Sequence, residues 1–347
     1  MKFTSTNILY YIFGAAIIIT FSYVVTNFKE KINTNNDYEM IQKYLLNESP
    51  LYGYNRPKLW IHTKYDMNAR KWKDFYSRNT TDLNQPYIHL TIKTIIDHCG
   101  DDFNICLIDD ETFSKLIPAW DIQLNKLSDP IKSHYRQIGM TQLLYSYGGM
   151  IVPNSFICTK NLKEFYEENI ANGKPFVCEA NNNTLNIHNQ KRRLSFIPDM
   201  YFMGAKREDP VILQLVDYLK KLNGNLHVSN ETDFVGDISN WLLLNVEHNR
   251  MNLIDGEIIG IKTRDHKAIL LEDLMEEKFL KISNDSIGIY IPADEILNRT
   301  KYQWFAVMPS EDILKTNLIV AKFLMASIVD STSEYTKKSE IKSVVTL

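Results

Sequence analysis

The sequence has little cysteine. Only four cysteines occur among 347 residues, at positions 99, 106, 158 and 178, with no Cys-x-x-Cys pair and no Cys/His cluster at zinc spacing. A structural zinc site or a disulfide framework is therefore unsupported, and buried free thiols are the favoured interpretation. If the domain lies in an oxidising lumen, Cys99 pairs with Cys106, or Cys158 with Cys178.

Strong positive charge and the common catalytic motifs are also missing. The formal net charge is −3, and the longest basic run is Lys191, Arg192 and Arg193, which excludes nucleic acid as an expected partner. The chain lacks GxSxG, HExxH, GxGxxG, a P-loop and a protease-like Cys/His signature, so the familiar hydrolase and dinucleotide-binding classes are poor candidates. The hydrophobic content of 44% is that of a globular protein with a core.

No charged residue occurs from Phe3 to Phe28, and the apolar run from Ile8 to Val25 is long enough for a bilayer core of roughly 30 Å. Residues 1–28 are therefore predicted to form a transmembrane anchor of a single-pass membrane protein. A cleaved signal peptide is the alternative, although the apolar run exceeds a typical signal core. The flanking charges leave the membrane side undecided; the domain is lumenal if the anchor is of type II.

The remaining chain divides into three parts by composition. Residues 29–56 are polar and rich in asparagine, as in a stem, and residues 330–347 form a polar tail predicted to be disordered. Residues 57–329 alternate strand-like and helix-like patterns, which predicts an α/β domain with a mostly parallel sheet flanked by helices. Strands are expected in the segments PKLWIHT, NICLIDD, MIV, PFVCEA and YFMGAK, and helices over about 88–99, 129–147, 209–224 and 311–329.

Acidic residues follow several predicted strands. Asp109 and Asp110 end NICLIDD, Pro153 follows MIV, and Glu179 closes PFVCEA. Ligands of parallel α/β sheets sit at the carboxyl ends of the strands, so these residues are expected at one edge. Structural roles compete with functional ones, because Asp110 with Glu111 can begin a helix and Asp199 can cap a turn.

The segment QIGMTQLLYSYGGMIVPNS, residues 137–155, together with the opening PKLWIHT, carries a resemblance to a known family. It resembles GT-A-type glycosyltransferases of the DXD sugar-binding-region kind, such as family 32 and the capsular polysaccharide synthesis transferases. Their pattern runs Leu-Tyr-x-Tyr-Gly-Gly-Ile-Tyr-x-Asp-x-Asp after a helix of Asp-x-x-Arg type. The likeness spans roughly Pro57 to Leu222 and implies a GT-A-like fold.

The departures from that pattern fall on the family's charged positions. Gln137 and Met140 replace the helix aspartate and arginine, and Pro153 and Ser155 replace the two DXD acids. In the family those acids hold Mn²⁺ or Mg²⁺, and hard divalent cations need oxygen ligands that proline lacks. A Mn²⁺ or Mg²⁺ cofactor is thus possible in this family, but its conventional ligands are absent and no metal-binding residue is predicted here.

The resemblance nevertheless suggests a set of site residues. Arg136 lies on the same helix face as the replaced arginine and is a candidate for binding phosphate, as are Lys206 and Arg207, although a solvated role for Arg136 competes. The predicted catalytic residues are Glu179 and Asp199, and the predicted nucleotide-sugar-binding residues are His62, Asp109, Asp110, Arg136, Gly148, Gly149 and Ser155.

Two functions from different classes follow. The first is a membrane-anchored glycosyltransferase that moves a sugar from a nucleotide sugar to a glycan or glycoprotein acceptor. The second is a catalytically inactive protein of the same fold that serves as a glycan-binding or scaffold module. The combined loss of the charged family positions, including Pro153 and Ser155, motivates the second.

Overall fold

A computed structural model describes residues 56–63, 85–182, 194–224 and 231–328. All of them belong to the second of two compact units, Leu45–Leu347, and the first unit, Met1–Tyr44, lies outside the described residues. The predicted anchor, the predicted tail and nearly all of the predicted stem fall outside them as well.

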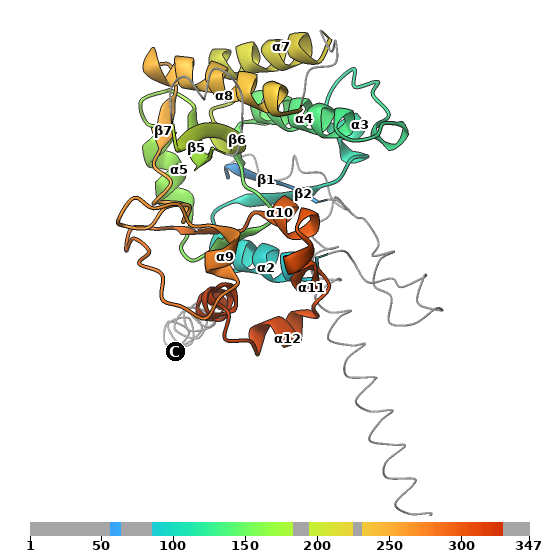
Figure 1. Ribbon diagram of the computed structural model, residues 1–347. Helices are drawn as coiled ribbons and strands as arrows, with labels where there is room; N and C mark the ends of the chain where they lie inside the picture. The colour runs from blue at the N-terminus through green and yellow to red at the C-terminus, as the bar shows by residue number, and fades with distance from the viewer. Residues whose placement is uncertain (1–55, 64–84, 183–193, 225–230, 329–347) are drawn as a thin grey trace, which may run out of the picture. The chain divides into compact units, whose positions relative to one another are not determined.

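The fold is built on a six-stranded sheet of order β2-β1-β3-β6-β5-β7 (Figure 1). β1 pairs parallel with β2 and β3, β5 pairs parallel with β7, and β6 pairs antiparallel with both of its neighbours. Five strands therefore run one way and β6 alone runs against them. The sheet strands are β1 (Lys58–His62), β2 (Asn104–Ile108), β3 (Gly149–Ile151), β5 (Phe176–Asn181), β6 (Phe196–Ala205) and β7 (Asn252–Ile254); β4 (Phe156–Cys158) and β8 (Gly288–Tyr290) form a separate antiparallel pair.

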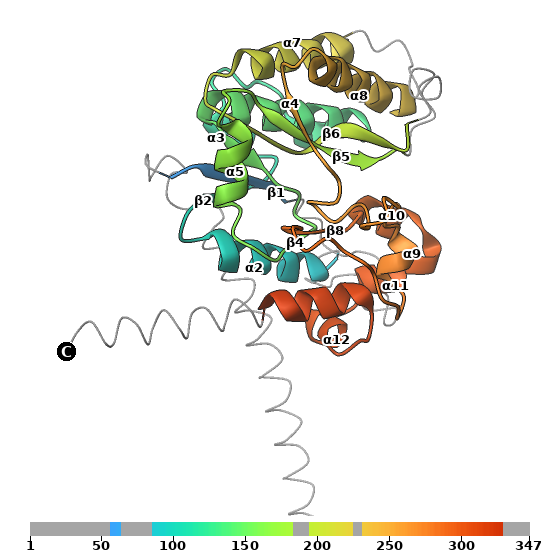
Figure 2. The same ribbon diagram turned by 90° about the vertical axis from the view of Figure 1, so that its left-hand side faces the viewer.

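Helices cover both faces of this sheet (Figures 1 and 2). On one face lie α3 (Thr112–Leu116), α4 (Ile131–Tyr147), α7 (Pro210–Gly224) and α8 (Glu231–Glu247). On the other lie α2 (Tyr87–Cys99) and the C-terminal helices α9 (Leu271–Leu274), α10 (Ala293–Asn298), α11 (Gln303–Ala306) and α12 (Ser310–Leu314). α5 (Lys163–Ile170) packs against β5 and β6, where the ring of Phe165 lies against those of Phe176 and Phe202. Two short 3₁₀ helices span Leu124–Lys126 and Thr300–Tyr302. The predicted α/β class with a mostly parallel sheet flanked by helices is confirmed.

Each helical layer has its own apolar core. Trp60, Ile108 and Leu144 belong to the core between the sheet and the α4–α7–α8 layer. Tyr87, Ile157 and Phe305 belong to the second core, which joins α2 to β4, β8 and the C-terminal helices. Burial of this much aliphatic and aromatic surface is the main stabilising contribution, at about 25 cal/mol per Å² of apolar area removed from water.

Two elements differ from the sequence expectation. The helix predicted over 311–329 is interrupted, since α12 ends at Leu314 and the next helical segment covers 319–328. Thr316 lies at this break, and its hydroxyl donates a hydrogen bond of 2.7 Å to the carbonyl of Ile313. The strand expected at YFMGAK begins earlier, at Phe196, and a register shift opposite Val177 and Cys178 makes β6 bulge.

The prediction of a single-pass membrane protein is corrected. Within the ranges 56–63, 85–182, 194–224 and 231–328, no helix has the length and apolar character needed to cross a bilayer. The segment on which that prediction rested, residues 1–28, lies outside these ranges.

Candidate functional site

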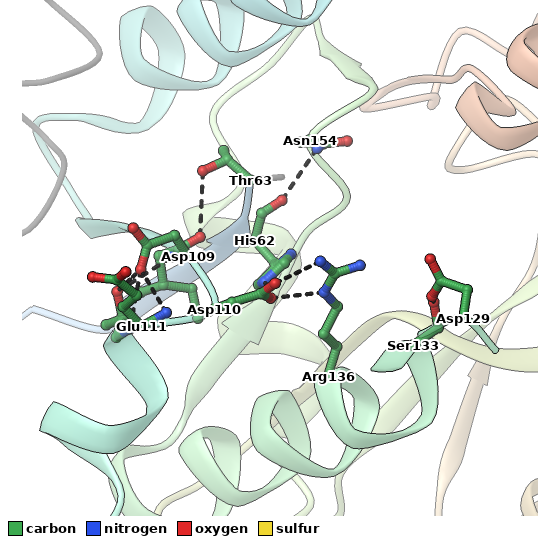
Figure 3. A network of polar contacts seen from close by, with 11 residues as sticks. His62, Thr63, Asp109, Asp110, Glu111, Asp129, Ser133, Arg136 and Asn154 are labelled. Carbon is green, nitrogen blue, oxygen red and sulfur yellow. Dashed lines mark hydrogen bonds and ion pairs between the residues drawn. The ribbon is translucent and has the colours of Figure 1, made fainter. Parts of the chain in front are cut away.

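The carboxyl ends of three parallel strands gather polar residues at one edge of the sheet (Figure 3). β1 ends at His62, β2 is followed by Asp109 and Asp110, and Asn154 lies just beyond β3. The amide of Asn154 donates to the carbonyl of His62 at 3.1 Å, which fixes the end of β1 against the segment after β3. Parallel pairing of β1 with both neighbours is what brings these strand ends together.

An ion pair from α4 completes this edge. The guanidinium of Arg136 donates two hydrogen bonds to Asp110, from Nε to Oδ1 at 2.7 Å and from Nη2 to Oδ2 at 2.5 Å. Nε2 of His62 lies 3.0 Å from the same Oδ1, and the imidazole stacks on Phe113 at a centroid distance of 5.6 Å. Such a bidentate geometry holds the arginine rigidly. The sequence prediction named all three polar residues, and the structure brings them together; their role in binding stays a prediction.

The protonation of Asp110 follows from these contacts. Partial burial by itself raises the pKa of this carboxyl, but the hydrogen bonds from Arg136 and His62 outweigh burial and hold its pKa well below the usual range. Asp110 therefore stays ionised at neutral pH. Because a depressed pKa stabilises the fold above the unfolded-state value, this contribution is present above about pH 4 and is lost as the pH falls through the folded-state pKa.

Asp110→Asn is expected to flatten the acid limb of the stability curve. From about pH 5 to about pH 2, the free energy of unfolding of the wild type falls more steeply than that of the variant, because only the wild type must protonate this carboxylate. Urea denaturation across this range measures both slopes. Asp121→Asn, at an exposed position, is the matched control and keeps the wild-type slope. Equal slopes for wild type and Asp110→Asn would show that the ion pair does not stabilise the fold.

Asp109 has a structural role at this edge. Its Oδ1 accepts hydrogen bonds from the backbone N–H groups of Glu111 and Thr112 at 3.1 and 3.0 Å and from the Thr112 hydroxyl at 2.6 Å. These bonds satisfy donors at the start of α3, as an N-terminal capping residue does. The sequence suggested that Asp110 with Glu111 begins the helix, but Asp109 has this capping role. Asp110 instead forms the ion pair with Arg136.

The positions that carry the DXD acids in the resembling family do not fit a divalent cation. Pro153 offers no side-chain ligand. Ser155 is only 2% exposed, and its hydroxyl donates a hydrogen bond of 2.7 Å to the carbonyl of Ile291. Among the described residues no group of three or more His, Cys, Asp or Glu side chains is arranged to hold a metal ion. The hydrogen bond from Ser155 to Ile291 ties the chain after β3 to the end of β8. The nucleotide-sugar contact of Ser155 stays a prediction.

Glu179 lies at the carboxyl end of β5 and is held by two partners. Its Oε2 forms an ion pair with Nζ of Lys262 and accepts a hydrogen bond of 2.9 Å from the backbone N–H of Gly256. Lys262 lies 3.2 Å from Asp255 and 4.5 Å from the ring centroid of Phe196. The side chain of Lys262 is 8% exposed and that of Glu179 is 15% exposed, so the pair is largely withdrawn from water. No sequence pattern points to Lys262, which is a single lysine in an irregular segment, 83 positions from Glu179.

Asp199 borders the bulge of β6 and pairs with Cys178 of β5. Its Oδ1 accepts a hydrogen bond of 3.1 Å from the backbone N–H of Tyr201. Burial among its neighbours raises the pKa of Asp199, and hydrogen bonds from backbone N–H groups oppose this only in part. Tyr201 in turn packs on Tyr290 at a centroid distance of 4.7 Å. A carboxyl with a raised pKa is a candidate acid or base.

The paired glycines lie at the opposite edge of the sheet. Gly148 ends α4 with φ +67°, and Gly149 begins β3 with φ +99°, a conformation that other residues rarely adopt. Because β6 runs antiparallel, its end at Ala205 pairs with Gly149, so Lys206 and Arg207 follow at this amino-terminal edge. These four residues are therefore separated from His62, Asp110 and Arg136 by the length of the strands. Their contacts with a nucleotide sugar stay a prediction, and they would be made from the edge opposite the Arg136–Asp110 ion pair.

A cavity of about 860 Å³ lies elsewhere, beside α5 and the end of β7. It is lined by apolar residues such as Phe165, Ile254 and Ile287 and by charged residues such as Lys163 and Glu168. None of the predicted site residues contributes to it. This cavity is therefore separate from the candidate site, which is defined by the side chains at the carboxyl edge.

Comparisons with known proteins give one structural likeness. No protein-family model matches the sequence, and no curated protein matches it. Among solved structures, the chain is similar to one titled PaToxG Glycosyltransferase, with 12% sequence identity, a TM-score of 0.30, and coverage of 61% of this chain and 79% of that chain. At this TM-score the likeness carries no argument about fold or function.

Proposed function

We propose that the carboxyl edge of β1, β2 and β3 binds a nucleotide sugar, and that the chain transfers the sugar to a hydroxyl of a glycan or glycoprotein acceptor. The observation that carries the proposal is the bidentate Arg136–Asp110 pair with His62 at this edge. The sequence resemblance of residues 137–155 to GT-A-type transferases supports the same assignment.

Each member of the network has a chemical task in this proposal. The Asp110 carboxylate accepts a hydrogen bond from a ribose hydroxyl, as acids after parallel strands do for nucleotides. Asp110 also takes two of the five N–H donors of Arg136 and so fixes the guanidinium. His62 and Arg136 donate to phosphate oxygens and stabilise the negative charge that grows on the diphosphate as its bond to the sugar breaks.

No step in this proposal passes through a metal ion, because Pro153 and Ser155 do not fit one. The acceptor hydroxyl loses its proton as the new glycosidic bond forms, and Asp199 is the better candidate for receiving it. Glu179 is already committed to Lys262, whereas burial raises the pKa of Asp199 toward the range that suits a general base.

Nucleotide-sugar binding is expected to depend on Arg136 and not on Arg207. Arg136→Gln is expected to weaken binding at least about 10-fold, since a charge-assisted contact to phosphate contributes about 1.5–3 kcal/mol. Arg207→Gln is the matched control: its side chain is 68% exposed at the opposite edge, and binding should not change. Calorimetric titration with a panel of uridine and guanosine diphosphate sugars, with and without Mn²⁺, measures both. If no nucleotide sugar binds the wild type, the proposal fails.

A second candidate function is a non-catalytic sugar-binding protein of the same fold. The burial of Ser155 and its hydrogen bond to Ile291 favour it, because this position is then part of the packing. Binding of a nucleotide sugar or glycan with no transfer to any acceptor would support this candidate. Sugar transfer that Asp199→Asn abolishes while binding persists would exclude it.

A further inference from the structure

Two buried thiols from separate elements lie in contact. Sγ of Cys99, the last residue of α2, lies 3.9 Å from Sγ of Cys158, the last residue of β4, and both residues are fully buried. They are 59 positions apart in the sequence. No comparable sulfur–sulfur contact involves Cys106 or Cys178, both of which also lie in the described part of the chain.

The backbone around these thiols is firmly held. The N–H of Cys158 donates to the hydroxyl of Thr94 on α2 at 3.0 Å, and its carbonyl accepts a hydrogen bond of 2.5 Å from the hydroxyl of Ser327. Ser327 also lies within hydrogen-bond distance, 3.1 Å, of Nε2 of His98, the neighbour of Cys99. α2, β4 and the helical segment 319–328 therefore converge on the pair, and only a shift of about 2 Å separates the sulfurs from a bond length of about 2.05 Å.

We propose that Cys99 and Cys158 form an intramolecular disulfide when the chain meets a small disulfide oxidant such as oxidised glutathione. One cysteine thiolate attacks the oxidant, forms a mixed disulfide and releases one glutathione thiol. The second cysteine thiolate attacks the protein sulfur of that mixed disulfide, forms the Cys99–Cys158 bond and releases the second glutathione thiol. The two cysteines lose two protons and two electrons in total, and the oxidant is reduced to two thiols.

The surroundings determine the rate and the effect of this step. Burial, followed by the neighbouring Cys99 thiol, raises the pKa of Cys158, so little thiolate exists at neutral pH and the reaction is slow until the pair opens locally. Once formed, the bond joins α2 to β4 across a long loop, and such a cross-link restricts the unfolded chain. It also removes the hydrogen bond that Sγ of Cys158 donates to the carbonyl of Lys160 at 3.1 Å.

Thiol counting tests this proposal on the full chain. After incubation with oxidised glutathione, the protein is denatured, its thiols are alkylated and its peptides are analysed by mass spectrometry. Of the four cysteines, only Cys106 and Cys178 are expected to be alkylated, and a cross-linked peptide two hydrogen atoms lighter than its parts contains Cys99 and Cys158. The thermal midpoint of the oxidised protein should rise by about 5 °C.

Single variants separate this pair from other thiol chemistry. Cys99→Ala should abolish the cross-linked peptide, and Cys106→Ala, the matched control for a buried thiol, should keep it. The wild-type count does not depend on whether a variant folds. Four alkylated cysteines after oxidation, a glutathione adduct that persists on Cys158, or a different cysteine pairing would overturn the proposal.

Discussion

Gly149→Ala is expected to destabilise the fold by more than about 3 kcal/mol, through both backbone strain and a steric clash. Gly149 has φ +99°, and a Cβ atom at this position would lie 2.1 Å from the carbonyl oxygen of Lys58 in β1. That oxygen belongs to the backbone of the neighbouring sheet strand, so it cannot move without breaking the pairing of β1 with β3. Urea denaturation of the purified variant measures the loss.

Gly173→Ala is the matched control for this prediction. Gly173 also has a positive φ, +77°, but no atom lies within 4 Å of its would-be Cβ, so only the backbone strain of about 1–2 kcal/mol remains. The difference between the two losses in free energy of unfolding measures the effect of the close approach of Gly149 to β1. Equal losses for Gly149→Ala and Gly173→Ala would contradict the tight contact between Gly149 and β1.

Lys262→Met is expected to cost about 3 kcal/mol, because it leaves Glu179 largely buried without its cation. Asp255 then adds a second unpaired carboxylate close by. Burial alone lowers the pKa of Lys262, but the hydrogen bonds that its ammonium donates to Glu179 and Asp255 outweigh burial, so this pKa is raised. The stabilising effect of the charged lysine is therefore present below the unfolded-state value of about 10.4 and is lost as the pH rises through the folded-state pKa.

Two further variants test the origin of this loss. The double variant with Glu179→Gln and Lys262→Met should recover most of the stability, because no uncompensated carboxylate remains at β5. Lys278→Met is the control, since Lys278 is 41% exposed in its ion pair with Asp273 and screened by water. A double variant as unstable as Lys262→Met, with wild-type stability for Lys278→Met, would mean that the lysine acts through packing and not through charge.

Periodic segments of the sequence predicted most of the sheet and its main helices. The apolar strand before His62 and the helix ending at Cys99 are found where expected, because strong local patterns agree with their tertiary packing. The same patterns placed Asp110 at the carboxyl end of a strand and Arg136 on a helix, but they did not predict the ion pair between the two residues. The short strands β4, β7 and β8, of three residues each, carry too little periodicity to be predicted.

Other parts of the site depend on pairing that no local pattern encodes. The antiparallel direction of β6 moves Lys206 and Arg207 to the edge opposite His62, and this direction follows from how β6 pairs with β3 and β5. In the same way, Lys262 reaches Glu179 only because the irregular chain after β7 folds back over β5. Sequence spacing pairs Cys99 only with Cys106, its nearest cysteine in the sequence. It does not predict the contact with Cys158, because tertiary packing of α2 on β4 brings these two residues together.

We propose above that a nucleotide sugar binds at the carboxyl edge formed by β1, β2 and β3. Photo-crosslinking with an azido derivative of whichever nucleotide sugar binds, followed by peptide sequencing, locates the bound ligand. Labels are expected at or beside His62, Asp110 and Arg136, and they should be lost in the presence of excess unmodified ligand. Labels concentrated at Gly148, Gly149 and Arg207, on the amino-terminal edge, would contradict it.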